Sequence, residues 1–116
     1  MHPGQLDAVA RHLRRLAGAP AGDVTDADLL GRYVADRDEA AFAALVERHG
    51  GLVWSVCRRL LDCREDIEDA FQATFLVLVR RAASVRQRTS VASWLYGVAY
   101  RTAMRAKRTI KASRSS

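Results

Sequence analysis

The apolar residues of this chain recur every three or four positions along nearly its whole length, and this spacing constrains the fold more than any other feature. Such spacing gathers apolar side chains on one face of an α-helix. Only two prolines and seven glycines interrupt the 116 residues. No stretch alternates polar and apolar residues as a half-buried strand does. The sequence therefore predicts an all-α fold, a small bundle of about four to five helices.

Capping and turn residues divide this pattern into segments. Thr25 or Asp26 would cap a helix that ends near Asp36, and Asp38 would cap a longer one that ends at Leu61. Ser90 or Ser93 would cap the last helix. The segments are then an amphipathic helix at 5–17 with a flexible join to residue 24, a helical domain at 25–108 with one helix at about 65–82 and the last at 91–108, and a disordered basic tail at 109–116.

The charges are distributed unevenly. Residues 80–116 carry ten basic side chains and no acidic one, although the net charge of the whole chain is only +6. Residues 62–79 carry five acidic side chains against one arginine. A strongly basic segment predicts a polyanionic partner, nucleic acid in the first place and an anionic membrane surface in the second.

The stretch DIEDAFQATFLVLVRR, residues 66–81, has two apolar stripes when it is drawn as a helix. One stripe contains Ile67, Phe71, Thr74 or Phe75, and Leu78, and it should face the core. The other is polar at its start and apolar at its end: Glu65, Asp69, Gln72, Leu76 and Val79. Periodicity alone leaves two readings of this second stripe open, burial on both sides of the helix or a docking face for a partner.

Basic and aromatic residues alternate after this helix. The loop SVRQRTS, residues 84–90, carries Arg86 and Arg88, and the helix after it turns Tyr96 and Tyr100 to the same side. Arginines bind phosphates and aromatic rings stack on unpaired bases, so this combination favours opened or single-stranded nucleic acid. The alternative is a solvated basic helix whose tyrosines cover the edge of the core.

Other functional classes find little support in the sequence. His49, Cys57 and Cys63 match no familiar metal-ligand spacing, and Cys57 on an apolar face suits the core. We expect no metal, no cofactor and no enzymatic activity. The two cysteines, the absence of an apolar leader and the absence of a membrane-length apolar run predict a cytoplasmic protein with free thiols that does not enter a membrane.

Three segments of the chain resemble region 2 of bacterial sigma factors, most closely the extracytoplasmic-function group. They are FAALVERHGGLVWSVCRRLL, DIEDAFQATFLVLVRRA and SVASWLYGVAYRTAMRAKR. Within them, the pattern D-x-E-D-x-x-Q-x-x-F precedes the block W-L-x-x-V-A, with the basic loop between the two. The resemblance covers about residues 26–108.

The resemblance implies a helical domain that binds core RNA polymerase at the clamp helices of its largest subunit and captures a flipped base of the promoter −10 element. By position, it assigns polymerase binding to Asp66, Glu68, Asp69, Gln72, Phe75, Leu76 and Arg80. It assigns DNA binding to Arg86, Arg88, Trp94, Tyr96, Tyr100, Arg101, Arg105, Lys107 and Arg108. An anti-sigma factor is a further partner that it suggests.

The chain departs from the family pattern at Ala73, where Glu is frequent, and at Arg101, where Asn is frequent. No segment here matches the family's second domain, the helix-turn-helix that reads the −35 element. The sequence therefore predicts a sigma-factor-like initiation protein that binds polymerase and melts the −10 element. The alternative is a truncated, non-initiating module that binds polymerase or a helical partner as a decoy or regulator.

Overall fold

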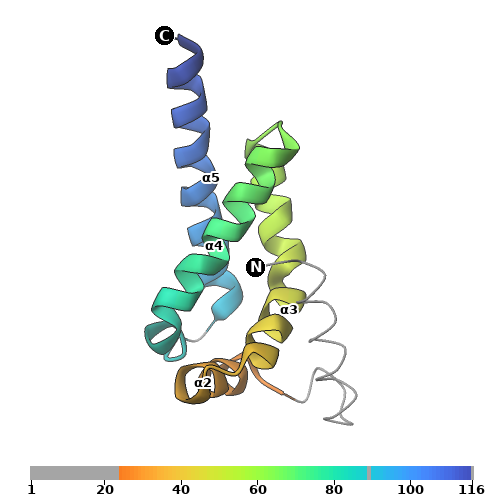
Figure 1. Ribbon diagram of the computed structural model, residues 1–116, viewed down its shortest axis with the longest axis vertical. Coiled ribbons are helices and arrows are strands. Elements are labelled where there is room, and N and C mark those ends of the chain that lie inside the picture. The colour runs from red at the N-terminus through yellow and green to blue at the C-terminus, as the bar shows by residue number, and fades with distance from the viewer. Residues whose placement is uncertain (1–23, 89, 116) are drawn as a thin grey trace. The chain divides into compact units, whose positions relative to one another are not determined.

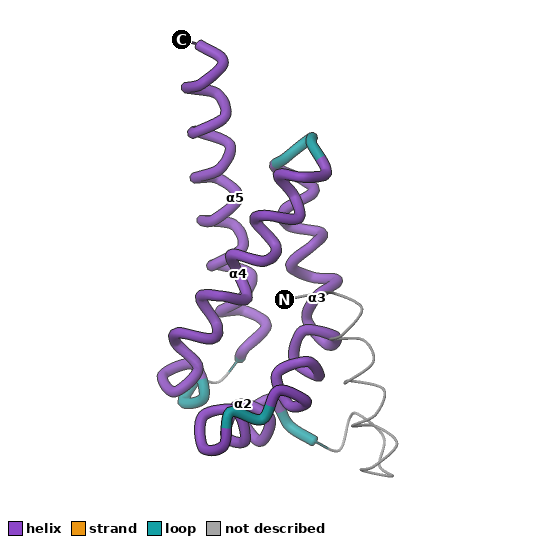
Figure 2. The backbone as a smooth tube through the Cα atoms, viewed as in Figure 1, coloured by secondary structure: helices purple, strands orange, loops and turns teal. Residues whose placement is uncertain are grey.

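Four helices joined by short turns make up the described part of the chain (Figures 1 and 2). The computed structural model describes residues 24–88 and 90–115. The helices are α2 (Asp26–Asp36), α3 (Glu39–Leu60), α4 (Arg64–Val85) and α5 (Val91–Ser115). These residues contain no strand, and the predicted all-α fold is confirmed. The helix predicted at 5–17 lies outside the described residues.

Helix α2 begins and ends where its sequence predicts. The Thr25 hydroxyl accepts a hydrogen bond from the backbone N–H of Asp28 at 3.0 Å, and the Asp28 carboxylate accepts one from the N–H of Thr25 at 3.3 Å. This reciprocal capping box satisfies two N–H groups that the first turn leaves without helical partners. The helix closes at Arg37, which adopts a left-handed conformation with φ of 53° and donates its N–H to the carbonyl of Tyr33.

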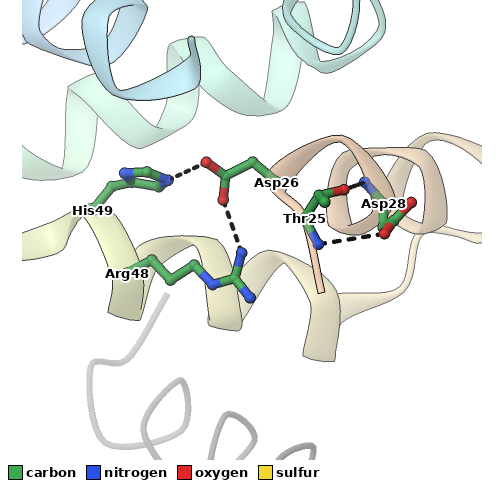
Figure 3. A network of polar contacts seen from close by, with 5 residues as sticks. All are labelled: Thr25, Asp26, Asp28, Arg48 and His49. Atoms are coloured by element: carbon green, nitrogen blue, oxygen red, sulfur yellow. Dashed lines mark hydrogen bonds and ion pairs between the residues drawn. The ribbon is translucent and has the colours of Figure 1, made fainter. Parts of the chain in front are cut away.

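Helix α3 begins at the predicted cap and is tied to α2 by an ion-pair network. The Asp38 carboxylate accepts hydrogen bonds from the N–H groups of Ala40 and Ala41 at 3.0 and 3.2 Å. Asp26, in the first turn of α2, lies between two side chains of α3 (Figure 3). Its carboxylate is 3.1 Å from Arg48 Nη1 and 2.9 Å from His49 Nε2.

The chain forms two compact units, each with its own share of the helices. The first unit comprises, of the described residues, 24–49 and 81–91. Its aromatic centre is the Tyr33–Phe42 pair, whose ring centroids are 5.1 Å apart. The Arg37 side chain covers Tyr33, with its guanidinium carbon 5.2 Å from the ring centroid. The buried apolar side chains of this unit are Leu29, Leu30, Tyr33, Ala41, Phe42, Ala43, Leu45, Ala82, Val85 and Val91.

The second unit comprises residues 50–80 and, of α5, the described residues from 92 onward. Phe71 joins an aromatic cluster, with ring centroids 5.8 Å from Trp54 and 5.1 Å from Phe75. Thr74 is fully buried, and its hydroxyl donates to the carbonyl of Ala70 at 2.8 Å, so no unpaired polar group enters the core there. The buried apolar side chains of this unit are Val53, Val56, Cys57, Leu61, Ile67, Ala70, Phe75, Leu78, Leu95, Val98, Ala99 and Ala103.

Two helix ends differ from the sequence prediction. Helix α4 continues past Ala82 to Val85, because the buried side chain of Val85 belongs to the core. Helix α5 continues to Ser115, and the prediction of a disordered tail from residue 109 was wrong for the described residues. After Gly97, no glycine or proline interrupts this segment, and Ala, Lys and Arg favour helix. The Thr109 hydroxyl also donates back to the carbonyl of Arg105 at 3.1 Å.

Candidate functional site

Helix α4 has two faces of different character. Ile67, Phe75 and Leu78 are buried, as the first stripe predicts. On the second stripe, Glu65, Asp69 and Gln72 are exposed, and so is 51% of Leu76. An exposed leucine beside carboxylates is not part of this chain's own core. The structure therefore decides between the two readings of the second stripe: α4 is buried on one side only.

The residues predicted to bind polymerase divide between these faces. Asp69, Gln72, Leu76 and Arg80 are exposed, and Asp66 and Glu68 are half-buried. Phe75, by contrast, is only 5% exposed and belongs to the aromatic cluster with Phe71. Phe75 therefore supports this face from beneath, and a direct contact with a partner is not available to it in this conformation.

The acidic start of α4 is only lightly neutralised. Glu65 and Asp66 lie in the first turn, where the helix dipole favours negative charge. Arg64 Nε donates to Glu68 Oε1 at 3.1 Å, but 84% of the Arg64 side chain is exposed, so this pair adds little stability. Among the described residues, Asp69 makes no ion pair. Most of the negative charge at this end therefore faces solvent.

The basic loop forms a tight turn at the end of α4. The N–H of Arg86 donates to Ala82, that of Gln87 to Ser84 and that of Arg88 to Val85, at 3.0, 3.2 and 2.9 Å. Val85 and Val91 are buried on either side of the turn. The side chains of Arg86 and Arg88 are exposed. Two apolar residues thus hold the turn in place, and both predicted DNA-binding arginines point away from the core.

Helix α5 also separates core from surface. Leu95, Val98, Ala99 and Ala103 are buried, while Trp94 is half-buried. The surface carries Tyr96 and Tyr100, which are 45% and 46% exposed, as the spacing predicts. The predicted DNA-binding cations of this helix are all exposed: Arg101, Arg105, Lys107 and Arg108.

The sequence prediction missed two cations of this surface. Lys111 and Arg114 are exposed on the last turns of α5. They were left out because that segment was expected to lack structure. The uninterrupted run of Ala, Lys and Arg residues was the signal that would have placed them on a helix.

The thiols and the acidic groups give no sign of a catalytic or metal centre in the described residues. No three His, Cys, Asp or Glu side chains lie together there in a way that would hold a metal ion. Cys57 is fully buried, and burial raises the pKa of its thiol above the ordinary value of 9.0, whereas Cys63 is exposed. Cys57 is a core residue, as its position on the apolar face of α3 predicts. No helix in the described part is long and apolar enough to cross a bilayer.

Known proteins resemble the chain over most of this region. The profile of the family described as Sigma-70 region 2 matches residues 45–113, which include α4, the basic loop and nearly all of α5. The "ECF RNA polymerase sigma factor SigK" of Mycobacterium sp. (strain KMS) is 37% identical over 81 residues. Proteins of the strains JLS and MCS, the latter named "RNA polymerase sigma factor SigK", match equally well.

The extent of these matches is partial. The aligned region covers 69% of this chain but 42% of each Mycobacterium protein. The chain thus spans less than half the length of the curated relatives it matches. No solved structure matches it significantly.

Proposed function

The chain belongs to the Sigma-70 region 2 family, and from this premise we propose that it takes part in transcription initiation by binding core RNA polymerase and single-stranded promoter DNA. It acts by binding and catalyses no reaction. Its place of action is the cytoplasm, where both partners are found. The outward face of α4 is the observation that carries the proposal.

That face has the composition of a protein-binding surface. Leu76 offers apolar area that can be removed from water, and the acids around it can pair with basic side chains of the partner. Burying the exposed half of a leucine contributes about 1 kcal/mol, and charge complementarity adds orientation and a faster association rate. A clamp helix with basic and apolar residues would fit both features.

The loop and α5 supply the DNA-binding side of the proposal. Arginines such as Arg86 and Arg105 would bind phosphates of the opened strand. Tyr96 and Tyr100, four residues apart on the surface of α5, would stack on its bases. Half-buried Trp94 has less free area for a base than either tyrosine. A surface of this kind suits the −10 element once its bases are unpaired.

A charge reversal on α4 tests the polymerase-binding half. We expect the double variant Glu68→Lys and Asp69→Lys to lose binding to core polymerase, because two attractive charges become repulsive ones. The measurement is a pull-down of purified core polymerase by the tagged chain, with helix content checked by circular dichroism.

The matched control changes the same number of charges away from α4. Asp36→Lys with Glu39→Lys alters two exposed acids at the α2–α3 turn and should leave polymerase binding intact. If the α4 variant is folded and still pulls down polymerase as well as the control does, α4 is not the docking helix.

A further inference from the structure

We propose that Gly31 of α2 is a positioning residue, which holds the guanidinium of Arg86 against the helix so that its donors face single-stranded DNA. This inference rests on the DNA-binding role proposed above for the basic loop. Gly31 and Arg86 are far apart in the sequence but belong to the same compact unit. Neither the family resemblance nor the charge pattern draws attention to this glycine.

The contact depends on the missing side chain. A Cβ atom added at Gly31 would lie 3.1 Å from Cζ, 3.1 Å from Nη2 and 3.2 Å from Nε of Arg86. Because three atoms of the planar group are at almost the same distance, the guanidinium lies flat across the glycine. A methyl group at this position would be closer to all three atoms than ordinary van der Waals contact allows.

The backbone of α2 gives no other reason for a glycine here. Gly31 lies in the middle of α2 and has no positive φ, so other residues could adopt its conformation. Glycine is among the least favourable residues at such a site, because it leaves the unfolded chain more freedom to lose than alanine does. The close approach of Arg86 is the one feature at this position that requires the absence of a Cβ atom.

The arginine is held without being neutralised. Within the described part of the chain, its side chain makes no ion pair and no hydrogen bond to protein, and the residue is exposed. Packing against α2 restricts the long side chain, so less conformational entropy is lost when it binds a phosphate. The guanidinium keeps its N–H donors for charge-assisted hydrogen bonds to that phosphate.

The geometric half of the proposal is tested by NMR on the full chain. The Nε–Hε signal of Arg86, assigned by its disappearance in Arg86→Lys, should shift in Gly31→Ala. It should not shift in Gly51→Ala, the matched control, because a Cβ atom there would meet nothing within 4 Å. Both variants should unfold at or above the wild-type midpoint, since alanine favours helix. An unmoved Arg86 signal in Gly31→Ala would overturn the proposal.

The functional half is tested by fluorescence anisotropy with a labelled single-stranded DNA 20-mer of mixed sequence. Loss of a charge-assisted hydrogen bond in Arg86→Ala should weaken binding about tenfold. Partial loss of its positioning in Gly31→Ala should weaken binding about threefold. In the Arg86→Ala background, Gly31→Ala should cause no further loss, because its effect passes through Arg86.

The outcomes separate this inference from the proposed function. If Arg86→Ala binds DNA as the wild type does, the loop has no DNA-binding role, and the NMR result still decides whether Gly31 positions Arg86. If Arg86→Ala weakens binding but Gly31→Ala does not, the DNA-binding role stands and the positioning role is wrong. Equal losses from Gly31→Ala with and without Arg86 would also overturn it.

Discussion

At the scale of single residues, Cys57 shows how burial alone sets a chemical property. Its side chain is fully buried in α3, and no charged group is needed to explain its raised pKa. The thiolate is unfavourable there because the apolar surroundings cannot solvate it. The thiol therefore stays protonated in the folded chain at a pH where the unfolded chain begins to lose the proton.

This difference predicts a loss of stability in alkaline solution. Because the pKa of Cys57 is raised in the folded state, its contribution to stability is fully present below 9.0, its unperturbed value, and is lost as the pH rises through the folded pKa. The unfolded state then binds fewer protons, so the free energy of unfolding falls. Denaturant unfolding at several pH values measures the slope.

The Cys57→Ala variant isolates the effect from other groups that titrate at high pH. It should be less stable than the wild type, because a buried sulfur is removed, but its stability should fall less steeply above pH 9.0. Identical slopes for the two proteins would show that Cys57 does not contribute to the pH dependence.

Sequence reasoning succeeded at Cys57 and failed at Phe75 for a physical reason. Cys57 lies in the middle of one apolar stripe of α3, so periodicity alone places it inside. Phe75 lies beside Thr74 on a helix that carries apolar residues on two sides. Which of the two sides is covered depends on the contacts with Phe71 and its neighbours, and periodicity does not contain that information.

At the scale of helices, α2 is a short element whose ends are closed by local interactions. Its length of 11 residues is too small for a stable isolated helix. Its first turn is held by the Thr25 capping box, and the Asp26 carboxylate ties it to α3 through Arg48 and His49 (Figure 3). The cap and the tie lie on successive residues, so the start of α2 is where the helix is most strongly fixed.

Removal of the cap should destabilise the chain. We expect Thr25→Ala to lower the free energy of unfolding by about 1 kcal/mol, because the N–H of Asp28 loses its acceptor. Thr25→Ser keeps the hydroxyl and should cost much less. Urea unfolding followed by circular dichroism compares the two, and an alanine variant as stable as the serine variant would show that the cap is unimportant.

Helix ends illustrate the limit of local signals. The start of α2 and the start of α3 were predictable, because a capping side chain acts on N–H groups two or three residues away. The end of α4 was not, because Val85 continues the helix in order to fill the core. A stop signal of sufficient strength is absent there, and tertiary contacts decide the boundary.

At the scale of the whole molecule, the two proposed binding surfaces carry opposite charges. The start of α4 is acidic, whereas the segment from Arg80 onward has ten basic residues and no acidic one. This separation suits a protein that binds a basic protein surface with one segment and a nucleic acid with another. Tyrosines among the cations make the proposed DNA surface more than a source of positive charge.

The tyrosines and the arginines of α5 should affect DNA binding in different ways. Replacing Tyr96 and Tyr100 with alanine should cost about 1–3 kcal/mol for each stacked base but leave the salt dependence unchanged, because no charge is removed. Replacing Arg105 and Arg108 with alanine should reduce the slope of log K against log salt by about 0.7 for each lost phosphate contact.

Anisotropy titrations at several salt concentrations distinguish these effects, with a duplex of the same sequence as the second probe. The tyrosine variant should bind the duplex as the wild type does, because paired bases offer no face for stacking. A tyrosine variant that loses the same affinity for both probes would argue against stacking. All four side chains are exposed, so the helix content of both variants should match the wild type.

The sequence by itself determined the helical class, the caps of α2 and α3, the apolar faces and the charge separation. Each of these follows from the types and spacing of residues close together in the chain. Only the tertiary structure decided which side of α4 is covered, that Phe75 lies in the core, and that Arg86 rests on Gly31. Those outcomes arise from contacts between distant segments, because packing fills space with whichever side chains the fold brings together.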